Sequence, residues 1–288
     1  MKMRTRSSLI GIGLILPSAA GLILFYFVPF CMSVYYSFSK VSGRFVPAGL
    51  TNYESVLSSE VFRVAFGNTF AFLGLGLVLM LTAGFLLALL INKVSRYSRG
   101  LSSFGAAALL LPLVLPAGAV LMFFQVLAEP YGVLNGLLVQ LDVEPVRWLR
   151  SERAFSILML LFLWKNTGYT VVMLLSGLLS VPDDMLEAAR LDGAHGCGLF
   201  FCFTFVHMLP FFSISAVMGI MSAFKMYRES YMLFGKYPYQ SVYMLQNYLY
   251  NNFVSLNYQR LTSASVLFTL ALGVVLIPLL RVGLRECD

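Results

Sequence analysis

The stretch that decides the fold is residues 65–91, AFGNTFAFLGLGLVLMLTAGFLLALLI, which holds 27 residues without one charged side chain. An α-helix rises about 1.5 Å per residue, so about 20 residues cross the ~30 Å hydrocarbon core of a bilayer. Lipid offers no hydrogen-bond partners to the backbone, and this run is too long for a strand of a membrane barrel. The stretch is therefore expected to be a transmembrane helix.

Five further runs have the same character, and the composition agrees with them. Hydrophobic residues make up 59% of the 288 and charged residues 11%, against about 45–50% and about 25% in soluble domains. We therefore predict an all-α integral membrane protein with six spans. Prolines inside the runs are expected to kink their helices. The further runs are 9–30, 104–127, 154–179, 199–224 and 262–284, and the prolines are Pro17, Pro112, Pro116 and Pro210.

The first run is long for a cleaved signal peptide, whose apolar core has about 7–15 residues, so we expect an uncleaved anchor. Residues 1–64 would then form an anchor helix and a first external loop, and residues 65–284 one bundle of packed helices. The basic start and the cluster Lys93, Arg96 and Arg99 place both termini in the cytoplasm. The loops on the other side are also basic, so charge supports this orientation only through the first two spans.

The net charge of +7 does not indicate nucleic acid, because the basic residues are spread over short loops rather than gathered in a stripe. His195, Cys197, Cys202 and His207 lack the close, regular spacing of zinc ligands, so no metal is expected. No phosphate-binding Gly-x-x-x-x-Gly-Lys-Ser/Thr string and no catalytic triad occurs. We expect neither a cofactor nor an enzyme activity in this chain.

The segment 181–198, between the fourth and fifth runs, departs longest from apolar character, and it begins VPDDMLEAARLDGAH. Pro182 and the acidic pair Asp183 and Asp184 suit the first turn of a helix. Gly193 permits the left-handed turn that ends one. The segment is thus predicted to form a short amphipathic helix, a tight bend and a second helix that enters the membrane at Leu199. Physics alone leaves two readings open: a connecting helix at the interface, and a docking surface.

Within this segment, the string EAARLDGA at residues 187–194 resembles the EAA loop of binding-protein-dependent ABC importer permeases. Weaker likenesses to the maltose-type sugar permeases of that family run through 17–38, 68–69, 87–92, 132–138 and 174–182. Three features depart from the family pattern. Phe205 and Val206 replace the usual Leu-Pro pair, residues 195–198 (HGCG) replace the usual aromatic or polar residues after the Gly-Ala, and residues 232–239, MLFGKYPY, replace the usual glycine-rich turn.

The resemblance implies the type I ABC importer transmembrane fold, with segment 181–198 as a coupling helix in a groove of a cytoplasmic ABC ATPase dimer. Glu187 would make the polar contact, Ala188 and Ala189 would allow close approach, Gly193 would set the bend, and Asp192 belongs to the same set. The implied partners are that ATPase, which would hydrolyse ATP, a second similar permease and an extracytoplasmic sugar-binding protein. The implied function is carbohydrate import. A permease for another solute and a stand-alone secondary transporter or channel remain alternatives.

Lys165, near the middle of the fourth run, is a candidate for the substrate pathway. A lysine at a span centre costs about 2.5–3.5 kcal/mol on the insertion scale, and ionisable groups kept there are functional by default. The alternative is a lysine that snorkels or pairs within the bundle. Other side chains suit sugar hydroxyls near the membrane midplane, although each could instead bond helix to helix. They are Asn68, Asn166, Tyr169, Ser213 and Ser215.

Overall fold

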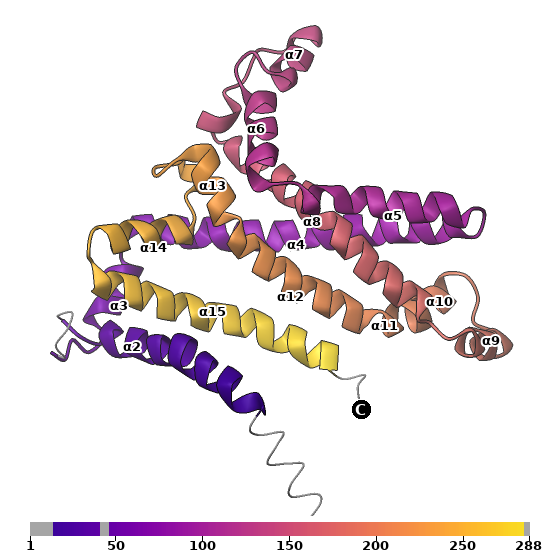
Figure 1. Cartoon of the computed structure of the whole chain (residues 1–288), viewed down its shortest axis with the longest axis horizontal. Coiled ribbons are helices and arrows are strands. Elements are labelled where there is room, and N and C mark those ends of the chain that lie inside the picture. The colour runs from indigo at the N-terminus through magenta and orange to yellow at the C-terminus, as the bar shows by residue number, and fades with distance from the viewer. Residues whose placement is uncertain (1–13, 41–45, 285–288) are drawn as a thin grey trace, which may run out of the picture. The chain divides into compact units, whose positions relative to one another are not determined.

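The computed structural model describes residues 14–40 and 46–284, and these residues are helical with no β-strand beyond one isolated bridge between Ser39 and Pro47. Six helices are long and apolar enough to cross a membrane, which confirms the predicted all-α membrane fold (Figure 1). They are Leu14–Ser37, Glu60–Ser95, Ala117–Gln140, Ala154–Leu179, Leu209–Phe234 and Tyr258–Gly283.

The elements follow in chain order. The first half has η1 (Ile23–Phe27), α2 (Val28–Ser37), α3 (Thr51–Leu57), α4 (Glu60–Ser95), α5 (Arg99–Val114), α6 (Ala117–Ala128), α7 (Val133–Gln140) and η2 (Trp148–Arg150). The second half has α8 (Ala154–Leu179), α9 (Asp183–Leu191), α10 (Cys197–Leu199), η3 (Phe200–Thr204), α11 (Phe205–His207), α12 (Leu209–Lys225), α13 (Tyr227–Phe234), η4 (Gln240–Val242), α14 (Leu245–Val254) and α15 (Tyr258–Leu284).

The predicted third span, residues 104–127, is not one helix. Helix α5 ends at Val114, Leu115 is extended with ψ 139°, and α6 begins after Pro116. A proline disfavours the helical conformation of the residue before it and has no N–H to donate, so the break falls at Leu115–Pro116. The apolar stretch that qualifies as a span runs instead through α6 and α7, Ala117–Gln140.

The predicted fifth span, 199–224, is helical but broken. Helix α11 ends at His207, and α12 begins at Leu209 with Pro210 in its first turn. Pro210 cannot donate to the carbonyl four residues earlier, and the backbone closes the preceding turn at Met208 instead. The kink expected at Pro210 is present. The described part of the first span extends to Ser37, and the last begins at Tyr258; residues 9–13 of the first prediction lie outside the described residues.

The contacts divide the chain into two compact units. One takes the described residues up to Arg63 together with Tyr248–Leu272, and the other takes Val64–Asn247 together with the chain from Gly273 onward. In the first unit the buried Ser37 is a hub: its hydroxyl lies 2.6 Å from the Tyr53 hydroxyl, and its carbonyl accepts from Asn52. The division at residue 64 expected from the sequence remains a prediction.

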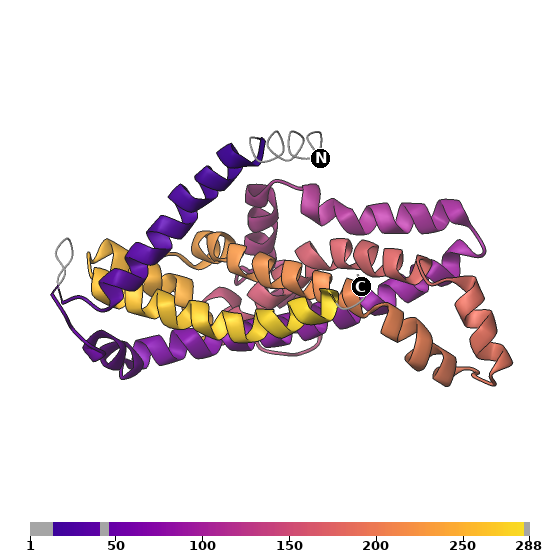
Figure 2. The ribbon, with the colours of Figure 1, turned by 90° about the horizontal axis from the view of Figure 1, so that it is seen from below.

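In the second unit α8 is the central helix, because it packs against both α5 and α12 (Figure 2). Gly168 of α8 sits directly on the Leu109 carbonyl of α5, where any β-carbon would collide with the backbone. Small residues permit such close approach between membrane helices. Towards the end of α8 that leads to α9, a core of Ala88, Leu174 and Met208 joins α4, α8 and the residue before α12.

Candidate functional site

The segment between α8 and α12 has the geometry expected from its sequence. Pro182 is the N-cap residue of α9, and Asp183 and Asp184 occupy the first turn, where carboxylates stabilise the positive end of a helix. Gly193 has φ +89°, a backbone conformation that side chains with a β-carbon rarely adopt. The predicted short helix and glycine turn are therefore present.

A Schellman motif closes this helix. The N–H of Ala194 donates to the Ala189 carbonyl at 2.9 Å, and the N–H of Gly193 donates to the Arg190 carbonyl at 3.1 Å. These two bonds satisfy carbonyls that the helix end would otherwise leave without donors. Gly193 occupies the left-handed position that the motif requires. The bend after α9 is therefore built into the backbone and does not need a partner to hold it.

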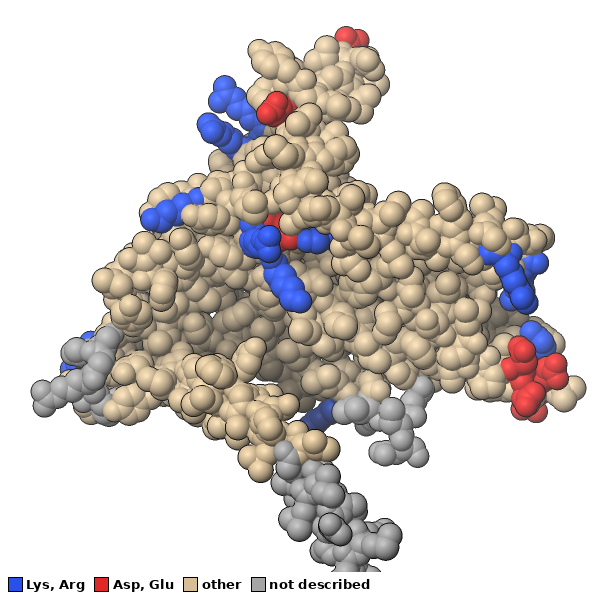
Figure 3. Space-filling model, in the orientation of Figure 1, with Lys and Arg blue, Asp and Glu red and all other residues tan. Residues whose placement is uncertain are grey.

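The outer face of this segment is acidic. Glu187, Ala188, Asp192 and Gly193 are exposed, whereas Ala189 is 2% exposed and covered by its own chain. Of the two alanines expected to permit close approach, only Ala188 faces outward. Carboxylate atoms gather at the end of the second unit where α9 lies (Figures 1 and 3). The segment also exposes the Arg190 guanidinium and the Leu191 side chain, which is 89% exposed, so a docking partner meets carboxylates, one arginine and apolar groups.

Lys165 does not stand alone in its span. Its Nζ lies 2.5 Å from Oε1 of Glu229 on α13, and the two side chains are 22% and 7% exposed. This is the one ion pair within 4.0 Å among the described residues. Pairing removes most of the penalty of an isolated charge in a membrane-spanning helix. The alternative of pairing within the bundle is therefore the arrangement observed.

Glu229 is the residue that sequence reasoning missed. It lies in the apolar span Leu209–Phe234 and is buried, and its Oε2 has no hydrogen-bond partner among the described residues. The sequence could have indicated such a residue, because a lysine within one membrane-spanning helix needs an anionic partner from another. Glu229 was missed because its neighbours Lys225 and Arg228 are charged, so the sequence there is typical of an external loop.

The remaining polar candidates have different surroundings. Asn166 and Tyr169 lie on α8 near Lys165, and Ser213 and Ser215 are buried on α12, which packs against α8. The amide of Asn166 donates to the Phe162 carbonyl one turn earlier, at 2.8 Å. The structure therefore brings these four and Lys165 onto two neighbouring helices.

Asn68 is separate from that group. Its Nδ2 donates to the carbonyls of Gln240 and Tyr243 at 2.7 and 3.0 Å, and its neighbour Thr69 accepts from the Leu245 N–H at 2.8 Å. Both side chains of α4 thus hold the connection between α13 and α14. These hydrogen bonds give Asn68 a structural role, because its amide nitrogen already donates to two carbonyls.

The histidines and cysteines of the fifth span do not assemble. No group of three His, Cys, Asp or Glu side chains placed to hold a metal ion occurs in the part of the chain that the structure describes. His207 Nε2 lies 3.4 Å from the Ser180 hydroxyl, which links the two arms that flank α9.

Residues 80–284 match the family described as the binding-protein-dependent transport system inner membrane component. A probable ABC transporter permease of Sinorhizobium fredii is 32% identical over 273 residues, covering 91% of this chain and 87% of the relative. A trehalose/maltose transport system permease of Thermococcus litoralis is 28% identical, over 82% of this chain and 81% of the relative. A sulfoquinovosyl glycerol transport system permease of Agrobacterium fabrum is 30% identical, over 86% and 81%.

The fold has a solved counterpart. The crystal structure of a bacterial ABC transporter involved in the import of the acidic polysaccharide alginate contains a chain with a TM-score of 0.77 and 21% identity, covering 98% of this chain and 96% of the other. The family match spans more than two thirds of the chain, and the first of these relatives aligns along nine tenths of it. This chain belongs to the family of binding-protein-dependent transport system inner membrane components.

Proposed function

We propose that this chain is one permease subunit of an ATP-driven importer that receives a carbohydrate from an extracytoplasmic binding protein. The family membership supports an import permease. The cargo is supported by the names of relatives that transport trehalose and maltose, arabinooligosaccharides and sulfoquinovosyl glycerol. The chain itself would not hydrolyse ATP, because that step would belong to a separate ATPase dimer.

The observation that carries the proposal is the preformed α9 segment. A force-transmitting contact needs a surface that keeps its shape, and α9 is fixed at one end by Pro182 and at the other by the Schellman turn at Gly193. Glu187 and Ala188 are exposed on it and would meet the ATPase, while Ala189 supports the helix from within. Asp192 adds charge beside the turn.

The orientation follows from this assignment. The α4–α5 connection and α9 lie at the same end of the second unit (Figure 1). If α9 meets a cytoplasmic ATPase, the basic residues Lys93, Arg96 and Arg99 are cytoplasmic too, as the positive-inside rule expects. Six spans then leave both termini on that side of the cell membrane. A second, similar permease would complete the pathway.

The substrate pathway would include polar side chains of α8 and α12, two helices that pack against each other. Lys165, Asn166 and Tyr169 of α8 and Ser213 and Ser215 of α12 are the proposed contacts, and Glu229 joins them through Lys165. Ser215 is buried with no hydrogen-bond partner among the described residues, so it has bonding capacity to offer. Asn68 is the weakest member of the set, because it already bonds two carbonyls.

Purification of the tagged chain in mild detergent tests the docking part of this proposal. We expect an ATPase and a second permease to co-purify, and Glu187→Gln to weaken ATPase binding about 10- to 150-fold, since a hydrogen bond to a charged group contributes about 1.5–3 kcal/mol. Glu144→Gln is the matched control, because Glu144 is also exposed but lies in the α7–η2 connection. A native chain that purifies alone, under conditions that preserve such complexes, would contradict the proposal.

The cargo needs a separate assay. In proteoliposomes that contain both permeases, the ATPase and the binding protein, ATP hydrolysis should rise when the binding protein is loaded with an oligosaccharide. If amino acids or polyamines stimulate ATP hydrolysis and no carbohydrate does, the import mechanism still holds but the cargo is not a carbohydrate.

A further inference from the structure

A cavity of about 430 Å³ lies where α4, α8, α9 and η3 meet. Its wall is amphiphilic: one part is formed by apolar side chains and another by an amide, a hydroxyl, a guanidinium and a carboxylate. The apolar residues are Leu89, Leu178, Leu179, Val181, Leu186 and Phe200, and the polar ones are Asn92, Arg96, Asp183 and Thr204.

The polar part of this cavity is bordered by positive charge. Arg96 lines it, Lys93 lies one turn earlier on α4, and Arg99 opens α5; all three are exposed. No carboxylate of the described residues lies within 4.0 Å of these cations, and Asp183 is the one acid on the cavity wall. Figure 3 shows Lys and Arg atoms gathered at the end of the unit where α9 lies, beside the acidic atoms.

The position of the cavity is the boundary between lipid and water. Leu89 belongs to the span Glu60–Ser95, and Leu178 and Leu179 end the span Ala154–Leu179. The charged residues begin within two turns beyond these leucines. An occupant that suits both parts has an anionic head and an apolar body. The phosphate of a phospholipid can bond Arg96 and Asn92 while its glycerol and upper acyl carbons contact the leucines.

We propose that this cavity binds the headgroup of one anionic phospholipid of the cytoplasmic leaflet. The side of the membrane rests on the proposed function; the binding chemistry does not. A free phosphate or nucleotide would satisfy the cations but not the apolar wall, and a zwitterionic lipid would place a second cation beside Arg96. Phosphatidylglycerol has the required single negative charge and two acyl chains.

The site has a consequence for the coupling segment. Its wall takes residues from the arm that enters α9 (Leu178, Val181) and from the arm that leaves it (Phe200, Thr204). A bound lipid joins both arms to the end of α4. It therefore restrains the base of the segment on which the ATPase would act.

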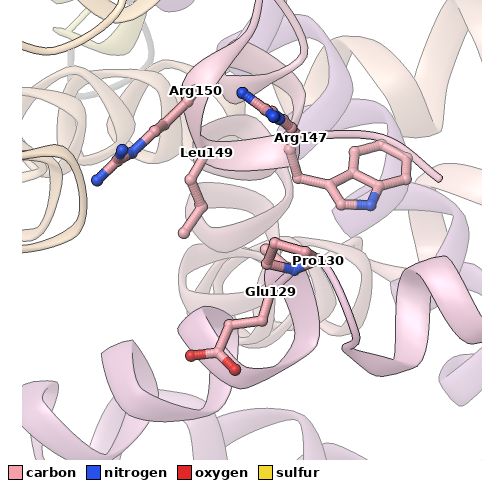
Figure 4. A pocket seen from close by; sticks show the side chains of 7 residues that line it. Glu129, Pro130, Arg147, Leu149 and Arg150 are labelled. Atoms are coloured by element: carbon pink, nitrogen blue, oxygen red, sulfur yellow. The ribbon is translucent and has the colours of Figure 1, made fainter.

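Native mass spectrometry of the whole purified chain tests the site with defined phosphatidylglycerol and phosphatidylcholine of the same acyl chains. Each Lys or Arg near an anionic lipid contributes about fivefold in affinity, so Lys93→Gln/Arg96→Gln should bind phosphatidylglycerol about 25-fold more weakly. Arg147→Gln/Arg150→Gln is the matched control. Those arginines have the same spacing and exposure and line a different pocket of about 510 Å³, opposite Glu129 (Figure 4). Its affinity should stay within about twofold.

A second measurement uses the unmodified chain, so a variant that folds badly does not decide the outcome. Photoactivatable phosphatidylglycerol should label peptides that contain residues 89–96, 178–186 or 200–204. Labelling only elsewhere would overturn the proposal. Equal weakening by both pairs of substitutions, or by neither, would also overturn it.

Two competition experiments distinguish a bound lipid from other occupants of the cavity. Displacement of phosphatidylglycerol by millimolar inorganic phosphate would mean that the site takes soluble phosphate groups. Displacement by the bound ATPase would mean that the cavity is part of a protein interface. Retention against both supports the lipid. None of these readouts needs transport, so their failure leaves the import function standing, and a chain that imports nothing could still bind the lipid.

Discussion

Removal of the Glu229 carboxylate should destabilise the second unit through the charge that it leaves behind. In Glu229→Ala the ammonium of Lys165, 22% exposed in the native chain, loses the acceptor that lies 2.5 Å away. Removal of one partner from a buried ion pair costs about 3–5 kcal/mol. Because Lys165 keeps partial access to the surface, which weakens the interaction, we expect about 2–3 kcal/mol.

The double variant separates the pair from simple loss of packing. Lys165→Met/Glu229→Ala removes both charges and retains the apolar length of the lysine stem, so it should be more stable than Glu229→Ala alone. The coupling energy of the cycle should be about 2 kcal/mol, above the ~0.6 kcal/mol average of polar contacts between membrane helices. Unfolding by SDS in mixed micelles, followed by circular dichroism, measures the free energies of unfolding of the wild type, Glu229→Ala, Lys165→Met and the double variant. Strictly additive losses would show that the two side chains do not interact and would refute this reasoning.

Three further substitutions test other parts of the structure. Gly193→Ala places a β-carbon at φ +89°, which costs about 1 kcal/mol. We expect the free chain to relieve that strain by opening the turn, so the ATPase must re-form it and should bind about fivefold more weakly; binding unchanged from wild type would show that the free variant keeps the turn. Gly168→Ala should separate α5 from α8 and lower the free energy of unfolding in the same SDS titration by about 1–3 kcal/mol. Gly105→Ala is the control, because Gly105 has open space around it and its substitution should leave the stability unchanged. Asn135→Ala leaves the Val146 N–H and the Trp148 indole N–H without their shared acceptor and the Pro130 and Val146 carbonyls without the amide donor, so protease cleavage between residues 141 and 153 should accelerate; unchanged cleavage would show that this connection holds without Asn135.

The sequence predicted the number and type of the spans because a run of about 20 predominantly apolar residues is long enough for a helix to cross a bilayer. It predicted the helix and bend of residues 183–193 because proline, aspartate and glycine each favour one position at a helix end. The break at Leu115–Pro116 was harder to place. Pro112 and Pro116 lie in the same run, yet Pro112 stays inside α5 and only Pro116 ends it. The sequence does not say which proline the surrounding helices accommodate.

Long-range partners could not be read from the sequence. Lys165 pairs with a residue 64 positions away, and Asn68 bonds carbonyls more than 170 positions away. Both contacts depend on how the helices pack, which no local pattern encodes. The same limit explains why Asn68 and Asn166 looked alike as amides in apolar runs. In the structure one holds a distant connection, and the other bonds the carbonyl four residues before it in its own helix.

The two arms that flank α9 differ in stiffness, and this difference bears on how a displacement of α9 would spread. Helix α8 has 26 residues, about 39 Å, with no proline, and its glycines Gly168 and Gly177 serve close packing against Leu109 and Phe211. The other arm passes through a π-helix and the break at Met208 before α12 begins. π-Turns and proline breaks are where helices bend. A push on α9 would therefore travel along α8 to Lys165 as a rigid movement, while the second arm absorbs it as a change of angle. The buried ion pair lies on the stiff arm, so such a movement would load it together with the close contacts at Gly177 and Gly168.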